Sequence, residues 1–349
     1  MNVLGSTFDE VASAVTPLPK DLRPLRAAYR TVLRGETAAA GVPGADLVLE
    51  AHVHPVVRHH QDGDLIKFVQ RSPDELEIES VIVPMRRRTR AWKSLCVSSQ
   101  IGCARGCGFC ETARMGFLRQ LSPAEIVGQV VAARREFAAD IRNVVFMGMG
   151  EPMDNLDAVI QAVRVLSDRC GLSIGKPQIC ISTVGRPEGI RRIAALGWRR
   201  LNLAVSLNAP NDDIRSRLMP VNRLEPMSAL REALLEYPLR SCQFFMIEYV
   251  LIPGMNDACE HARQLAEFLR PVKCCVNVIP FNPAPGASFK APTDESVQQF
   301  LSWLHQAGQY CKPRLTKGRS QMAACGQLGN VALRQAVRAE PSNSPASST

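Results

Sequence analysis

Four cysteines stand close together in the stretch "CVSSQIGCARGCGFC", which spans residues 96–110. Cys103, Cys107 and Cys110 have the spacing C-x3-C-x2-C, and Cys96 stands seven residues before them. Three thiolates can occupy three corners of a tetrahedral ion or of a cubane cluster and leave a fourth position open. The triplet therefore predicts a metal site that a further ligand completes.

A zinc site is one alternative for the triplet, but a closed structural site needs a fourth protein ligand. The nearest group of candidates lies some 40 residues upstream in "AHVHPVVRHHQ", without the usual zinc spacing. We interpret that group as a polar surface strand. Spacing alone leaves an iron-sulfur cluster and zinc as equal alternatives. The histidines concerned are His52, His54, His59 and His60.

Composition limits the class of protein. A chain of 349 residues is long enough for one large α/β barrel, and 46% hydrophobic residues with only 5% aromatic ones indicate an aliphatic core. No secretory leader or long apolar run is present, which predicts a cytoplasmic protein that does not enter a membrane, with reduced thiols. The charge of +9 suits RNA or DNA as partner, although general solubility explains it equally well.

The elements that position the cysteines follow a regular alternation. Beyond about residue 93, six apolar strand-like runs alternate with amphipathic helical segments, and Ser122 with Glu125 predicts a capping box at the first helix. Six βα units are fewer than the eight of a closed barrel, so we expect a partial, laterally open one. The triplet directly follows the first run, where such barrels carry their chemistry. The runs are 94–99, 143–149, 178–183, 201–207, 244–251 and 274–280.

Smaller regions flank the predicted barrel. Residues 1–50 are expected to be a short helical region with a break at 35–46, and residues 51–92 a small β extension with a hairpin over 64–84 and a basic linker at Arg86 to Arg90. The barrel is expected over residues 93–335. Residues 336–349 form a Ser/Pro/Ala-rich tail that we expect to be disordered.

Five motifs in order carry a resemblance to a known family: "LCVSSQIGC", "FMGMGEPMDN", "SLNAPNDDIR", "NVIPFNPAPG" and "AACGQL". The chain resembles the radical S-adenosylmethionine (SAM) superfamily and, within it, the RlmN/Cfr family of RNA methyltransferases, nearer to the RlmN branch. The resemblance implies that Cys103, Cys107 and Cys110 bind three irons of a 4Fe-4S cluster. SAM would chelate the fourth iron, which explains the open corner.

The resemblance also assigns roles to two cysteines and a carboxylate. One SAM would methylate Cys325, and a second, cleaved at the cluster, would give a radical that activates the S-methyl group for addition to an adenine carbon. Glu79 would remove the ring proton, and Cys96 would form a disulfide with Cys325 to release the product. Without the resemblance, both cysteines are better interpreted as inert buried thiols, and Glu79 as part of an alternating strand.

The resemblance implies a SAM site at successive strand ends. Adenosine 2503 of 23S rRNA is the implied substrate, modified at carbon 2, with a tRNA adenosine as a second substrate and carbon 8 as the alternative position. An electron donor such as flavodoxin or ferredoxin is also implied, and we expect a monomer. The sequence departs from the family in its short N-terminal region, in Asn208 where His is usual, and in Arg319 to Gln321 where acidic residues are common. The implied SAM-binding residues are Gly150, Glu151, Ser182, Ser206, Leu207, Asn208 and Asn282.

Overall fold

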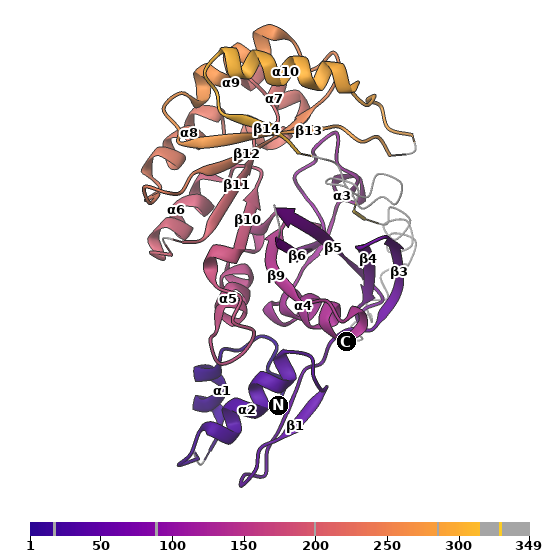
Figure 1. Cartoon of the computed structure of the whole chain (residues 1–349), viewed down its shortest axis with the longest axis vertical. Coiled ribbons are helices and arrows are strands. Elements are labelled where there is room, and N and C mark those ends of the chain that lie inside the picture. The colour runs from indigo at the N-terminus through magenta and orange to yellow at the C-terminus, as the bar shows by residue number, and fades with distance from the viewer. Residues whose placement is uncertain (17–18, 88–89, 199, 285, 315–327, 330–349) are drawn as a thin grey trace, which may run out of the picture.

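A ten-stranded mixed sheet forms the centre of the computed structural model (Figure 1). The structure describes residues 1–16, 19–87, 90–198, 200–284, 286–314 and 328–329. The strand order is β14-β13-β12-β11-β10-β9-β6-β5-β4-β3. The order of the strands in the sheet is therefore their order in the sequence, and the segment between β6 and β9 contributes no strand to this sheet.

Seven neighbouring strands of this sheet run parallel. The first six are the predicted βα strands, so the partial barrel is confirmed. The seventh, β14 (Cys311–Pro313), was not predicted because it is only three residues long and pairs with β13 alone. The six are β6 (Arg90–Cys96), β9 (Ile141–Phe146), β10 (Ile179–Thr183), β11 (Asn202–Ser206), β12 (Phe245–Leu251) and β13 (Cys274–Pro280).

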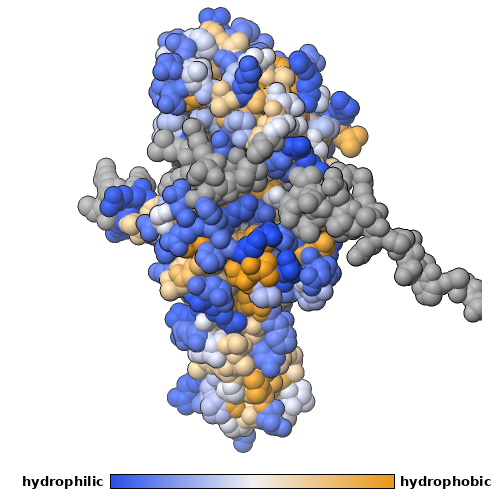
Figure 2. All heavy atoms as spheres, turned by 90° about the vertical axis from the view of Figure 1, so that its right-hand side faces the viewer, coloured by the Kyte–Doolittle hydropathy of each residue, from blue (hydrophilic) through white to orange (hydrophobic). Residues whose placement is uncertain are grey.

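Three antiparallel strands extend the barrel sheet at the β6 edge. The predicted hairpin is β4 (Leu65–Arg71) and β5 (Glu77–Arg87), and β5 continues the ladder onto β6. The outer strand β3 (Val56–Asp62) carries His59 and His60 as exposed residues, as expected of a polar surface strand. Figure 2 shows this face of the molecule, where hydrophilic residues predominate around a smaller hydrophobic patch.

Helices cover the outside of the parallel strands. The capping box at the start of α4 is present, since the Ser122 side chain accepts from the Glu125 amide and the Glu125 side chain accepts from the Ser122 amide. A small sheet of β7 (Gln100–Gly102) and β8 (Phe117–Gln120) flanks the cysteine loop. The helices are α3 (Glu111–Met115), α4 (Pro123–Phe137), α5 (Leu156–Ser167), α6 (Pro187–Ala195), α7 (Asp212–Leu218), α8 (Met227–Glu236), α9 (Cys259–Leu269) and α10 (Asp294–Gln306).

The N-terminal region packs against the barrel helices as part of one apolar core. It comprises α1 (Phe8–Ala14), α2 (Arg23–Leu33) and a two-stranded sheet of β1 (Ala39–Gly41) and β2 (Val48–Glu50). The predicted break thus contains a strand, because β1 finds its partner across the turn. The buried Tyr29 hydroxyl lies 3.3 Å from the Asp168 carboxylate, which joins α2 to the loop after α5.

No helix of the described residues is long and apolar enough to cross a lipid bilayer.

Candidate active site

One face of the sheet brings together residues from strands far apart in sequence. The register aligns Val81 of β5, Cys96 of β6, Val145 of β9 and Cys180 of β10 in one row. Residues two positions further along each strand share that face. The face therefore leads from the extension into the barrel interior, where a cavity opens at the carboxyl ends of the parallel strands.

The three predicted cluster cysteines all line this cavity. The backbone fixes their loop, because the Cys103 amide donates to the Gly116 carbonyl and the Gly108 amide donates to the Leu218 carbonyl, each at 2.9 Å. Burial raises the pKa of the Cys103 thiol to about 12 and also raises the pKa of Cys107 and Cys110. Buried thiols of this kind need a bound metal to become thiolates.

The donors around the triplet bear on the two alternatives left by the spacing. A single zinc ion with Zn–S bonds of about 2.3 Å needs its sulfur ligands roughly 4 Å apart. Among the described residues, no three His, Cys, Asp or Glu side chains are grouped to hold one ion. His52 and His54 contact Glu50 and Glu125. In a cluster each cysteine binds a different iron, and the three cysteines stay the predicted ligands.

Glycines after β9 bring the backbone against the cysteine-bearing loop. A Cβ on Gly148 would lie 2.7 Å from the Ser98 amide nitrogen, and one on Gly150 would lie 2.6 Å from Gln100. Gly150 also has φ +99°, which side chains with a Cβ rarely adopt. Both positions therefore require glycine, and Gly150 and Glu151 both line the cavity.

The Glu151 carboxylate holds the neighbouring strand ends. Its two oxygens accept from the Met153 amide at 3.0 Å and the Val184 amide at 2.8 Å, while its own amide donates to Gln100 at 2.7 Å. Burial raises the pKa of this carboxyl to about 7, although the hydrogen bonds oppose the shift. Its carboxylate is thus bound to the protein, which leaves the backbone of this turn to contact a ligand.

Asn208, which stands where the family usually has His, has a backbone conformation that suits either residue. Its φ of +57° is left-handed, a conformation that Asn and His adopt more readily than most residues. The side chain accepts from the Val250 amide at 2.9 Å and donates toward Met219. Asparagine therefore preserves the backbone shape that the position needs. The other predicted SAM-binding residues that line the cavity are Gly150, Glu151, Ser182 and Ser206.

Two predicted SAM-binding residues lie elsewhere. Leu207 is buried in the apolar core, where its amide lies 3.1 Å from the Glu248 carbonyl. Asn282 lines a separate hollow on the other side of the cysteine loop, together with Phe109. The structure brings neither side chain into the cavity that contains the cysteines.

Glu79 is buried and contacts Gly329 near the C-terminal end of the chain. Its carboxylate forms an ion pair with Lys67 at 2.8 Å and accepts from the Gly329 amide at 2.9 Å. Because Val81 pairs with Cys96, Glu79 and Cys96 are diagonal neighbours on one face, with Cα atoms about 7 to 8 Å apart. Cys325 and Arg319 to Gln321 lie outside the described residues, as do Arg88, Arg199 and the tail at 336–349.

The sequence analysis missed Arg215, the largest fully buried side chain among the described residues. Its guanidinium donates to the carbonyls of Leu207 and Val184 and to Asn222, so it ties the loops after β10 and β11 together. Burial lowers its pKa to about 10. Its position at the end of "SLNAPNDDIR" is the sequence signal that could have identified it.

Glu248 and Arg314 were missed as well, and both line the cavity. The Glu248 carboxylate binds Arg314 at 2.9 Å and accepts from Asn277 at 2.8 Å, and Arg314 also contacts Met147. Glu248 and Asn277 lie on the adjacent strands β12 and β13, and Arg314 directly follows β14, but the residues are 29 to 66 positions apart in sequence. No local spacing marks them, so only the fold reveals the group.

Comparison with known proteins agrees with this geometry. Residues 97–269 match the family model described as the radical SAM superfamily. A crystal structure of a radical SAM methyltransferase from Sphaerobacter thermophilus superposes with a TM-score of 0.84 at 36% identity, covering 94% of this chain and 98% of that one. The partial barrel and its cysteine triplet define a radical SAM enzyme, and this membership implies a 4Fe-4S cluster and SAM as cofactors.

Curated relatives narrow the class further. A probable dual-specificity RNA methyltransferase, RlmN 1, from Protochlamydia amoebophila is 44% identical over 80% of this chain and 77% of its own length. The dual-specificity RNA methyltransferase RlmN of Campylobacter jejuni is 36% identical over 96% of this chain and 99% of its own length. The chain belongs to the RlmN family of radical SAM RNA methyltransferases.

Proposed function

We propose that this enzyme methylates carbon 2 of an adenine, with adenosine 2503 of 23S rRNA as the principal substrate and a tRNA adenosine as a second one. The proposal includes a monomeric enzyme and a one-electron donor such as flavodoxin or ferredoxin. The full-length similarity to proteins named dual-specificity RNA methyltransferases supports two kinds of RNA. Carbon 8 is the competing position on the ring.

Two hydrogen bonds, made by Leu328 and Gly329, support the mechanistic part of the proposal. The buried Glu79 carboxylate accepts from the Gly329 amide, and the Thr112 hydroxyl next to the cysteine triplet bonds the Leu328 carbonyl at 2.5 Å. Cys325 precedes Leu328 by three residues, and three residues of extended chain span at most about 11 Å. Leu328 and Gly329 thus lie between the cluster loop and Glu79, which supports a role for Cys325 at the active site.

The roles of the protein groups follow from this arrangement. When bound, the cluster and SAM supply the methyl group and the one-electron chemistry that activates it. Cys325 would carry the methyl group as a thioether and attach it to the adenine carbon. Glu79 would accept the ring proton, since its buried carboxylate accepts a hydrogen bond from Gly329, which lies four residues after Cys325 in the sequence. Cys96 would then attack the Cys325 sulfur, which breaks the protein–RNA bond and forms a disulfide.

Two cysteine variants test this sequence of steps. Cys96→Ala is expected to accumulate a covalent protein–RNA adduct, because no thiol resolves it. Cys325→Ala is expected to form neither adduct nor methylated RNA. The adduct is measured by denaturing gel electrophoresis after anaerobic turnover. Normal release of methylated RNA by both variants would refute the two-cysteine mechanism.

Mass spectrometry of cellular RNA identifies the product. We expect 2-methyladenosine in rRNA and tRNA to disappear when the gene is deleted and to return on complementation with the wild-type chain. A loss of 8-methyladenosine instead would show that carbon 8 is the target. An unchanged nucleoside profile would mean that the enzyme modifies another RNA position.

A further inference from the structure

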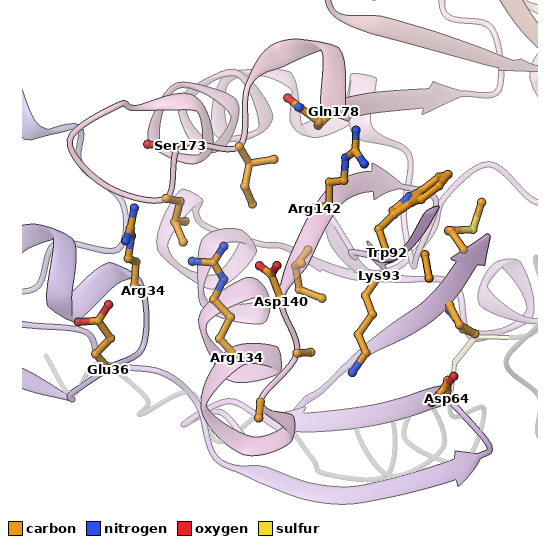
Figure 3. Close-up of a pocket in the computed structure, with 18 residues that line it drawn as sticks. Arg34, Glu36, Asp64, Trp92, Lys93, Arg134, Asp140, Arg142, Ser173 and Gln178 are labelled. Carbon is orange, nitrogen blue, oxygen red and sulfur yellow. The ribbon is translucent and has the colours of Figure 1, made fainter. Parts of the chain in front are cut away.

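A second large hollow lies at the opposite end of the parallel strands (Figure 3). It has a volume of about 1060 Å³ and lies between the N-terminal region, the end of α4 and the amino ends of β6 and β9. In Figure 3, Arg34 and Glu36 lie on one side, Trp92 and Lys93 on the other, and Arg134 between them. The five motifs that carry the family resemblance supply no residue that lines this hollow. The strands β6 and β9, which precede two of the motifs, do contribute lining residues.

Four cationic side chains line the hollow: Arg34, Lys93, Arg134 and Arg142. Within the described part of the chain, none of the four forms an ion pair, although Arg34 and Arg142 are exposed. The Arg134 Nε is buried and has no hydrogen-bond partner among the described residues, and burial lowers the pKa of Arg134. An unsatisfied buried donor is costly, so an acceptor atom of a bound ligand would stabilise this side chain.

An aromatic side chain accompanies these cations. Trp92 is half-buried, and the Arg142 guanidinium lies over its ring at 5.3 Å. The same hairpin continues from Lys93 and Trp92 to the exposed Arg86 and Arg90. Cationic side chains with an aromatic ring are the combination that binds a phosphate backbone together with an unstacked base.

Acidic residues at the hollow are fewer than the cations. Glu36, Asp64 and Asp140 line it, and all three are exposed. With Arg86 and Arg90, the hollow and the adjoining hairpin carry six cations against these three carboxylates. This surplus of positive charge has the same sign as the overall charge of +9. It favours a polyanion over a neutral metabolite.

We propose that this hollow and the adjoining hairpin form a second RNA-docking site that holds the phosphate backbone of the substrate away from the reacting adenine. The inference rests on the RNA-methylating function and names a contact surface for it. Five residue steps along β9 lead from Ile141 at the hollow to Phe146 at the active site, which is about 16 Å along the strand. About five stacked nucleotides cover that length, so one RNA can reach both ends.

Charge removal tests the docking site. The double variant Lys93→Gln/Arg142→Gln is compared with Arg263→Gln/Arg270→Gln, which removes two exposed charges from α9 and the residue after it, at the far end of the molecule. The probes are a 23S rRNA transcript that contains the target adenosine and an unrelated transcript of equal length. Binding is measured by fluorescence anisotropy over a salt series with holoenzyme, and thermal unfolding verifies that each variant folds.

The expected result is a roughly tenfold loss of affinity for both transcripts in the hollow variant only. The slope of log K against log salt should fall by about 2, since each lost phosphate contact lowers it by about 1. Unchanged affinity and slope would overturn the inference while leaving methylation intact. If the hollow variant lost its salt slope but wild-type holoenzyme methylated neither transcript, the proposed function would fail and the docking site would stand.

Two further measurements separate RNA from other ligands. With Trp198→Phe/Trp303→Phe, Trp92 is the remaining tryptophan of the chain, and RNA should quench its fluorescence because a base or phosphate comes within contact. Absence of quenching would place the RNA elsewhere and overturn the proposal. Inorganic pyrophosphate is the probe for a small anion. If pyrophosphate bound in the hollow at micromolar concentration without displacing RNA, the hollow would serve a small anion instead.

Discussion

The two ends of the parallel strands are built from different kinds of side chain. At the carboxyl ends, thiols and a carboxyl group are buried, and their pKa values are raised to about 12 at Cys103 and about 7 at Glu151. At the amino ends, exposed and half-buried guanidinium and ammonium groups surround a wide hollow. The first end is arranged for chemistry at a cost in folding free energy, and the second for binding by charge. Substitutions should therefore affect turnover at one end and affinity at the other.

The largest effect is expected from removing a cluster ligand. Cys107→Ser should lose the visible absorbance of the iron-sulfur cluster and all detectable methylation, because the remaining two thiols hold too few irons. Cys259→Ser, on α9, is the matched control and should keep both. Iron content and RNA methylation of the anaerobically reconstituted proteins give the comparison. A Cys107 variant with full iron and activity would contradict the cluster assignment.

A large loss of stability is expected at the buried Lys67–Glu79 pair. The two side chains are 14% and 4% exposed, so removing one charge leaves the other charge poorly solvated. Lys67→Met should lower the free energy of unfolding by about 3 to 5 kcal/mol. Lys67→Met/Glu79→Gln should recover part of that loss, which a double-mutant cycle in urea measures. Additive effects would mean that the pair is not coupled.

The pH dependence of stability tests the burial of Glu151. Its pKa is about 7 in the folded protein against 4.5 for an ordinary glutamate. Between these values the folded protein keeps a proton that the unfolded chain has released, so stability falls as pH rises and stays lower above pH 7. The loss is on the order of 3 kcal/mol. Urea titrations of the cluster-free protein should show this slope, and Glu151→Gln should flatten it; an equal slope in both would assign it to another group.

A smaller effect is expected from packing at the turn after β9. Gly148→Ala places a Cβ within 2.7 Å of backbone atoms of Val97 and Ser98, which cannot move aside as a flexible side chain would. Stability should fall by about 1 to 3 kcal/mol. Gly41→Ala, in β1, meets no atom within 4 Å and should stay within about 0.5 kcal/mol of wild type. Equal urea midpoints for the two variants would show that the turn has room.

The sequence was most informative where the determinants are local. Periodicity located six strands within a few residues, and the spacing of Cys103, Cys107 and Cys110 indicated an open metal site. The group of Glu248 and Arg314 could not be predicted, because their contact depends on the register of strands far apart in sequence. The hollow around Trp92 could not be predicted for the same reason, since five separate stretches of the chain form it.

The unbroken ladder from β5 to β6 has a mechanical consequence. Seven residue pairs, from Val81 with Cys96 to Arg87 with Arg90, join the antiparallel extension to the barrel. A hinge between the two parts would have to break these backbone hydrogen bonds, so the extension and the barrel move as one stiff body. Glu79 and Cys96 hence keep a constant spacing throughout turnover. Any movement during a catalytic cycle must therefore come from a part of the molecule other than this joint.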